Sequence, residues 1–103
     1  MAKISVVAKL TVKADKIDEF VAAISTMCDY IAANEPGTEQ YVAHQSQTEP
    51  NVFFITEIYT EQAALDTHSN SPGMTAFGAA LGGVVEGAEL TFTNPVKAVG
   101  VTL

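Results

Sequence analysis

The stretch from Val52 to Tyr59 constrains the fold most, because its sequence, VFFITEIY, predicts a strand with two apolar faces. β-Branched and aromatic residues dominate it, as is typical of packed strands. Side chains alternate across a strand, so Phe53 and Glu57 share one face while Phe54 lies on the other. A strand that is apolar on both sides predicts a sheet with a covering layer on each face. Glu57 is therefore expected to be a carboxylate in apolar surroundings.

A helix is expected directly after this strand. Thr60 is a suitable N-cap, and the alanines and the leucine that follow are strong helix formers. His68 lies on the same stripe as these apolar residues, so the imidazole is predicted to point towards the sheet rather than into water. The helix should stop near Asn70, since Ser71-Pro72 is typical of the cap and first position of a new helix.

The remaining elements extend this alternation of strands and helices. They are a strand over Lys3–Val12, a helix capped by Asp15 that ends near Asn34, a mostly polar strand over Glu39–Thr48, a helix from Met74 to about Val85, a strand over Ala88–Phe92 and an apolar tail over Val96–Leu103. With right-handed crossovers, this order predicts an α+β, ferredoxin-like βαββαβ fold in a single domain of residues 1–103. The first and third strands should be central.

The helices of such a fold cover only one face of the sheet. Because the other face is also apolar in this sequence, we expect a homodimer in which a second copy covers it, with the tail docked on the partner. The composition agrees with this. The hydrophobic share is 48% and the charged share is 17%, so the chain carries more apolar surface than a domain of 103 residues can easily hide.

Charge and cysteine content exclude several classes of partner. Twelve acidic side chains against five basic ones, all lysines, give a net charge of −7, which disfavours nucleic acid and anionic membrane surfaces. No apolar span is long enough to cross a membrane, and we expect a soluble cytoplasmic protein. Cys28 is the one cysteine, so neither an internal disulfide nor a cysteine metal cage is possible, and we interpret it as a small core thiol.

Polar residues that could carry chemistry lie on the central strand, the helix after it and the polar strand before it. Burial should raise the pKa of Glu57, and histidine is the side chain suited to proton exchange near neutral pH, which makes His68 a second candidate. Tyr59 could orient a substrate or place its hydroxyl in water. Glu57 could equally form a structural hydrogen bond to backbone or to a partner subunit. Tyr41 and His44 should face opposite sides, and His44 by itself is typical of polar surface.

The segments KLTVKADKIDEF and FFITEIYTEQAALDTHSNSP resemble the antibiotic biosynthesis monooxygenase (ABM) domain family, whose members are dimeric α+β barrels. The shared pattern is an acidic residue two before an aromatic one, then Ala-Leu, a His, and Ser or Thr followed by Pro. It is matched by Glu57, Tyr59, Ala64, Leu65, His68, Ser71 and Pro72. Two positions depart from it, since many relatives have Trp in place of Tyr59 and His in place of Gly73.

The resemblance implies that O2 oxidises a small phenol or quinol in an apolar pocket between sheet and helices, without metal, flavin or haem. Either Glu57 or His68 would take the phenolic proton, and Tyr59 would be the third catalytic residue and orient the substrate. The expected substrate-binding residues are Phe53, Phe54, Phe77, His44 and Tyr41.

Three other functions fit the same resemblance: a non-catalytic small-ligand binder, a haem-binding or haem-degrading relative, and a relative that degrades a phosphorylated signalling molecule. The haem-degrading branch has an Asn on the first strand and the Trp, both of which this chain lacks. The chain has no arginine, the usual bidentate ligand of phosphate, which argues against the branch that degrades a phosphorylated compound.

Overall fold

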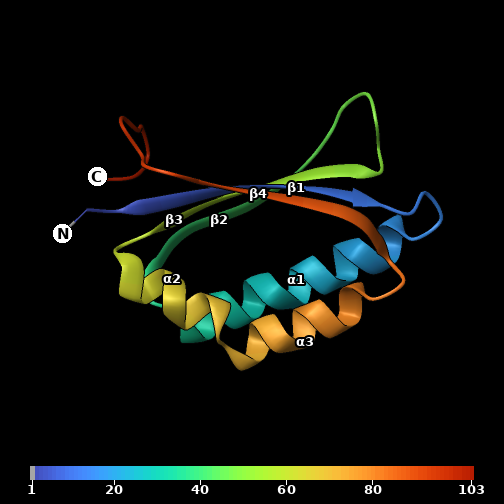
Figure 1. The fold of residues 1–103 in the computed structure, drawn as a ribbon, viewed down its shortest axis with the longest axis horizontal. Coiled ribbons are helices and arrows are strands. Elements are labelled where there is room, and N and C mark those ends of the chain that lie inside the picture. Colours follow the sequence, from blue (N-terminus) through green and yellow to red (C-terminus); the bar gives the residue numbers. More distant parts are fainter. Residues whose placement is uncertain (1) are drawn as a thin grey trace.

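The computed structural model describes residues 2–103 as a four-stranded antiparallel sheet with three helices on one of its faces (Figure 1). The strands are β1 (Ile4–Val12), β2 (Thr38–Gln45), β3 (Val52–Tyr59) and β4 (Val85–Thr93). The helices are α1 (Ile17–Asn34), α2 (Gln62–Ser69) and α3 (Pro72–Leu81). This order confirms the predicted α+β, ferredoxin-like fold, with the second helical region divided into α2 and α3.

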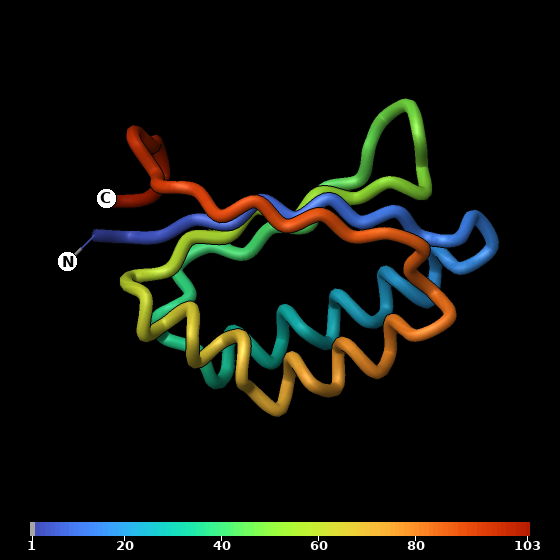
Figure 2. The backbone as a smooth tube through the Cα atoms, viewed as in Figure 1, coloured from blue at the N-terminus to red at the C-terminus, as the bar shows by residue number. Residues whose placement is uncertain are grey.

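The strands lie in the order β2-β3-β1-β4, so the first and third strands are central, as predicted. Val6 of β1 pairs with Glu57 of β3 on one side and with Phe92 of β4 on the other. The central position suits these two strands because it removes their backbone groups from water on both edges. Figure 2 shows β1 and β4 side by side and both chain termini at the same end of the sheet.

The starts of α1 and α2 differ slightly from the sequence prediction. The residue before α1 is Lys16 and the residue before α2 is Glu61, and neither side chain caps its helix. Asp15 and Thr60, which were expected to be the caps, therefore lie one residue too early. Their capping preference is a local tendency of about 1 kcal/mol, which packing of the helix against the sheet can override.

The start of α3 follows the prediction, but its end does not. Ser71 Oγ accepts a hydrogen bond from the Met74 N–H at 3.0 Å, and Pro72 occupies the first helical turn. The helix ends at Leu81 and not near Val85, because the chain reverses at Gly83, whose φ of +74° is left-handed. The two valines expected on the helix therefore belong to the turn and to the first residue of β4.

The core lies between the sheet and the helices. Phe20 of α1 is fully buried, and its ring centroid lies 4.6 Å from that of Phe53 on β3. The buried residues of this main cluster are Ala8, Leu10, Val12, Phe20, Ile24, Met27, Ile31, Phe53, Ile55, Phe77 and Val84.

None of the helices within residues 2–103 combines the length and the apolar character that a membrane span requires.

The opposite face of the sheet carries no helix (Figure 1). Val7, Val42 and Phe54 are exposed there, one from each of three adjacent strands. The second layer expected from the sequence is thus not supplied by residues 2–103, and a partner subunit in that position stays a prediction. We call this surface the open face.

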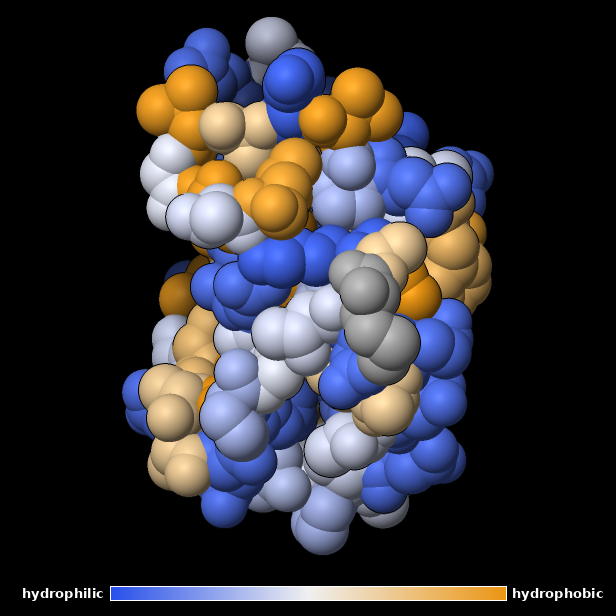
Figure 3. Space-filling model, turned by 90° about the vertical axis from the view of Figure 1, so that its left-hand side faces the viewer, coloured by the Kyte–Doolittle hydropathy of each residue, from blue (hydrophilic) through white to orange (hydrophobic). Residues whose placement is uncertain are grey.

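Residues 94–103 continue from β4 without regular secondary structure. The Lys3 ammonium donates to the Thr102 carbonyl and lies 2.6 Å from a carboxylate oxygen of Glu39, which ties the tail to the start of β1. Val96 and Val99 of the tail are largely exposed. Figure 3, which looks at the end of the molecule that carries the termini, shows hydrophobic patches mainly in the upper half, at the level of the sheet and the tail.

Candidate active site

A cavity of about 220 Å³ lies between the sheet and the helices α2 and α3. Its lining residues are Val6, Ala8, Leu10, Tyr41, Ile55, Glu57, Leu65, His68, Ser69, Met74, Phe77, Leu81, Ala88, Leu90 and Phe92. Most of these are apolar, and the lining groups able to exchange protons or donate hydrogen bonds are Tyr41, Glu57, His68 and Ser69. A mostly apolar cavity with a few convergent polar groups is the usual form of a small-molecule site.

The cavity is bordered by the edge strand β4. Leu90 and Phe92 pair with Ala8 and Val6 of β1, so their side chains point to the helix side of the sheet. They are nevertheless 57% and 63% exposed, which shows that the helices leave this part of the sheet uncovered. The rim of the cavity is therefore apolar, while its polar groups lie deeper inside.

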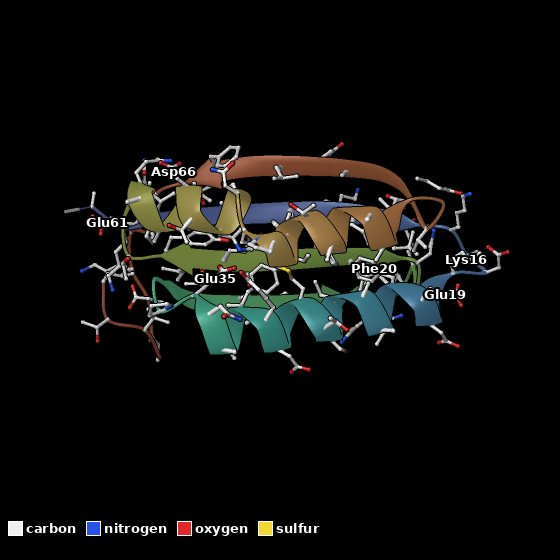
Figure 4. The ribbon with its side chains drawn as sticks, turned by 90° about the horizontal axis from the view of Figure 1, so that it is seen from below. Lys16, Glu19, Phe20, Glu35, Glu61 and Asp66 are labelled. Atoms are coloured by element: carbon white, nitrogen blue, oxygen red, sulfur yellow. The ribbon has the colours of Figure 1, made fainter. Side chains whose placement is uncertain are left out.

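His68 enters the cavity from α2 and is held by Glu35 at the end of α1. Nδ1 of His68 lies 2.9 Å from Oε1 of Glu35, and the two residues are only 4% and 6% exposed. Thr38 Oγ1 donates a second hydrogen bond to the same Oε1 at 2.8 Å. Oε2 of Glu35 is buried and has no partner within residues 2–103. Figure 4, seen from the helix side, shows Glu35 between the end of α1 and α2.

The turn after α1 explains why Glu35 reaches α2. Pro36 disfavours helical geometry at the residue before it, so the helix stops and the chain turns towards the sheet. Gly37 then packs against α2 so closely that a Cβ built on it would lie 2.6 Å from the Cβ of Ala64. Its carbonyl accepts a hydrogen bond from the Thr60 N–H at 2.9 Å. A glycine is needed here because any larger residue would separate the turn from α2.

Glu57 and Tyr59 form a second buried pair on β3. The Tyr59 hydroxyl donates a hydrogen bond to Oε1 of Glu57, and Tyr59 itself is completely buried. Burial raises the pKa of Glu57, whereas the hydrogen bond from Tyr59 and the nearby His68 lower it in part. Burial and then the hydrogen bond to Glu57 raise the pKa of Tyr59, so this phenol stays neutral.

Tyr41 completes the polar part of the cavity. It pairs with Glu57 in the β2–β3 register and therefore points to the helix side. The His68 ring lies close to two phenol rings, with its centroid 5.6 Å from that of Tyr41 and 5.4 Å from that of Tyr59. Burial, followed by the charge of Glu57, raises the pKa of Tyr41, so its hydroxyl is a neutral hydrogen-bond donor at the cavity wall. The arrangement can accept a proton from a bound molecule and donate hydrogen bonds to the oxygen left behind.

A second hollow, of about 330 Å³, lies between α1 and α3. Tyr30 is its one ionisable lining residue, and the others are small or apolar. It offers no acid–base pair, so the first cavity is the better candidate for proton chemistry. Within the described part of the chain, no group of three or more His, Cys, Asp or Glu side chains is placed to hold a metal ion.

The structure brings four of the eight predicted site residues together, since Tyr41, Glu57, His68 and Phe77 all line the cavity. Two more lie on the same face of the sheet but behind the lining. Tyr59 reaches the cavity only through Glu57, and Phe53 packs on Phe20 in the core. The predicted direct contact of these two residues with substrate is therefore not supported by their positions.

Phe54 and His44 do not belong to this cavity, which corrects the prediction that both contact a substrate there. They pair with each other in the β2–β3 register and lie on the open face. His44 Nε2 is 3.0 Å from Thr56 Oγ1 on that face. The reason is the strict alternation of side chains along β3, which sends residues 53 and 54 to opposite sides.

Glu35 is a site residue that sequence reasoning missed. The segment Glu35-Pro36-Gly37 predicts the end of a helix, and it has that role. Nothing in the local pattern links this carboxylate to His68, which is 33 positions further along the chain. The one available signal was Gly37, since a glycine after proline can mark a close backbone approach as well as a turn.

The fold and the site define a ferredoxin-like α+β domain with an acid–base cavity beneath its sheet. The sequence model of the family described as antibiotic biosynthesis monooxygenase matches residues 3–80, and the chain belongs to this family.

A curated relative, the uncharacterised protein sll1783 of Synechocystis sp. (strain ATCC 27184 / PCC 6803 / Kazusa), is 36% identical over 69 residues. The match covers 67% of this chain and 46% of the relative, so this chain spans about half the relative's length.

Solved structures agree with this assignment. A Caulobacter crescentus protein, named provisionally as an antibiotic biosynthesis monooxygenase, is 32% identical with a TM-score of 0.89, and the match covers 93% of this chain and 92% of that one. SnoaB of Streptomyces nogalater, a cofactor-independent oxygenase, has a TM-score of 0.83 over 98% of this chain and 100% of its own. At 16% identity the likeness to SnoaB establishes the fold alone.

Proposed function

We propose that this protein is a monooxygenase that oxidises a small quinol or phenol with O2 and uses no metal, flavin or haem. The observation that supports it most is the imidazole of His68, anchored at one nitrogen by Glu35 and set in the wall of an apolar cavity. Membership of the monooxygenase family supports the reaction class. The apolar lining and the aromatic ring of Phe77 favour an aromatic substrate.

A quinol can itself supply all the electrons that this reaction needs. One oxygen atom of O2 enters the ring and the other leaves as water, so quinol plus O2 gives hydroxyquinone plus water. In the first step, His68 removes the proton of a phenolic hydroxyl, and the resulting electron-rich anion reduces O2. Tyr41 donates a hydrogen bond to the oxygen that carries the developing charge, and Glu57 donates a second one when it is protonated, the form that burial favours.

Glu57 is the alternative base, and two conservative variants separate the roles. His68→Gln keeps a hydrogen-bond donor for Glu35 but cannot accept a proton at neutral pH. Glu57→Gln keeps the shape and a donor but removes the carboxylate. If His68 is the base, His68→Gln should lower kcat by about 10²- to 10⁴-fold, whereas Glu57→Gln should retain more activity. The reverse order would assign the base to Glu57.

The test measures O2 uptake by the wild-type protein with a panel of hydroquinones and naphthols, with autoxidation subtracted. Under ¹⁸O2 the product should gain one ¹⁸O atom. Asp66→Ala, an exposed change on the same helix as His68, is the matched control and should leave the rate unchanged. If panel compounds raise the melting temperature but no O2 is consumed, the protein is a non-catalytic binder and the proposed reaction is wrong.

The proposal includes a homodimer formed through the open face. Val7, Val42 and Phe54 expose apolar side chains on three adjacent strands of this face, and no helix covers it (Figure 1). An exposed apolar patch of this kind is typical of a protein–protein contact. A second copy would supply the missing layer without blocking the cavity, which lies on the other side of the sheet.

A further inference from the structure

We infer that Glu35 is a positioning residue that fixes the tautomer of His68, with the proton on Nδ1 and the accepting lone pair on Nε2. The inference rests on the proposed function and deepens it, because it identifies which ring nitrogen of His68 accepts the proton. It concerns a residue at the end of α1 that carries no part of the ABM sequence pattern described above.

The first step is that Oε1 of Glu35 acts as an acceptor. It lies 2.9 Å from Nδ1 of His68 and 2.8 Å from Oγ1 of Thr38, which donates to it. An ionised carboxylate only accepts hydrogen bonds, and the Thr38 hydroxyl already donates to this oxygen. With Glu35 ionised, the proton of the contact with His68 therefore belongs to Nδ1.

The second step is that Nε2 is then the basic atom. A neutral imidazole carries one N–H, and with that proton on Nδ1 the other nitrogen has a free lone pair. His68 lines the cavity, and Nδ1 is turned to Glu35 at the end of α1. The proton of a bound hydroxyl would therefore be taken up at Nε2.

The third step concerns the groups around the His68 ring. The titratable groups that face it are Glu35 from the end of α1, Tyr41 from β2, and Glu57 and Tyr59 from β3. The two tyrosines stay neutral. Glu35 is the group in contact with Nδ1, and it therefore orients the ring, as the acid of a carboxylate–histidine pair does in other enzymes.

Nitrogen NMR of the whole protein tests the inference without any substrate. The chain has two histidines, and exposed His44 provides an internal reference in every spectrum. In ¹⁵N-histidine-labelled wild type at alkaline pH, His68 should show a protonated Nδ1 and an unprotonated Nε2. Glu35→Leu removes the acceptor of the Nδ1 proton and should move the proton to Nε2, while the His44 signals stay unchanged.

The control is Thr38→Val, which removes the other hydrogen bond to the same oxygen. If Glu35 only ties the start of β2 to the end of α1, both variants should lose similar stability and neither should change the tautomer. If Glu35 sets the tautomer, only Glu35→Leu changes it. A wild-type spectrum with the proton on Nε2, or with both nitrogens protonated up to pH 9, would overturn the inference even if Glu35→Leu failed to fold.

Kinetics give a second readout where a substrate is turned over. Glu35→Leu should lower kcat about 10²-fold or more and change KM little, because it disables the base without altering the residues that line the cavity. An unchanged kcat in a variant whose tautomer has switched would show that Nε2 is not the accepting atom. If wild type oxidises no tested compound, the proposed function fails, and the NMR result still decides the tautomer.

Discussion

The hydroxyl of Tyr59 donates a hydrogen bond to the carboxylate of Glu57, two residues earlier on the same face of β3. The phenol takes the place that a water molecule would have beside an exposed carboxylate. Two opposing effects therefore set the pKa of Glu57, because burial raises it and this hydrogen bond lowers it. Tyr59 thus controls how readily Glu57 is ionised, although it does not line the cavity.

Tyr59→Phe should destabilise the fold by about 1–3 kcal/mol, because a buried acceptor loses its donor. The loss should be larger at pH 8 than at pH 4, since a hydrogen bond to an ionised carboxylate is stronger than one to the neutral acid. Urea unfolding at the two pH values measures this. Tyr30→Phe, on a tyrosine that lines the other hollow, is the control and should change the free energy of unfolding little. A larger loss at pH 4 would contradict the prediction.

Glu57→Gln should change how stability depends on pH. Burial raises the pKa of Glu57, so the folded state holds this proton more tightly than the unfolded chain does. Its stabilising contribution is fully present below the unfolded pKa, about 4.3, and is lost as pH rises through the higher folded value. The variant lacks this loss, so its free energy of unfolding relative to wild type should increase between pH 4 and pH 8. Exposed Glu86→Gln should show no such trend.

Most of the fold could be predicted from the sequence because its signals are local. Alternation in VFFITEIY predicted which residues of β3 share a face, and Ser71-Pro72 marked the start of α3. The end of α3 could not be read in the same way. Val84 and Val85 suit a helix stripe as well as a strand, and only the left-handed turn at Gly83 separates the two.

The candidate site was less predictable, because its contacts join distant parts of the chain. Parity correctly predicted that Tyr41 and His44 face opposite sides, and helical spacing placed His68 towards the sheet. The same parity rule separates Phe54 from Phe53, so grouping them in one aromatic slot was an error of geometry. The partnership of Glu35 with His68 depends on how the α1–β2 turn packs against α2, which no local pattern specifies.

The proposed dimer predicts that Phe54→Glu converts the protein to a monomer. Phe54 lies on the open face of the central strand β3, and a carboxylate buried there between two sheets would lack a partner. Light scattering at micromolar concentration measures the mass, and circular dichroism checks that the fold is retained. Val21→Glu, on an exposed valine of α1, is the matched control and should stay dimeric. A monomeric wild type, or a dimeric Phe54→Glu variant, would contradict the prediction.

Gly37→Ala should loosen the contact that brings Glu35 to His68. A Cβ at this position would lie 2.6 Å from the Cβ of Ala64, which is closer than non-bonded carbon atoms approach each other, so α2 must move away. We expect a loss of about 1–3 kcal/mol from this overpacking, and a change in the His68 nitrogen signals.

The double variant Gly37→Ala with Ala64→Gly separates this contact from other effects of the substitution. Ala64→Gly by itself should cost about 1 kcal/mol of helix propensity. It also removes the methyl group against which the new Cβ would collide. The losses of stability should therefore be non-additive: the double variant should lose less free energy of unfolding than the sum of the two single losses. The His68 signals should return towards those of wild type. Additive losses would show that the space between the α1–β2 turn and α2 does not set the position of Glu35.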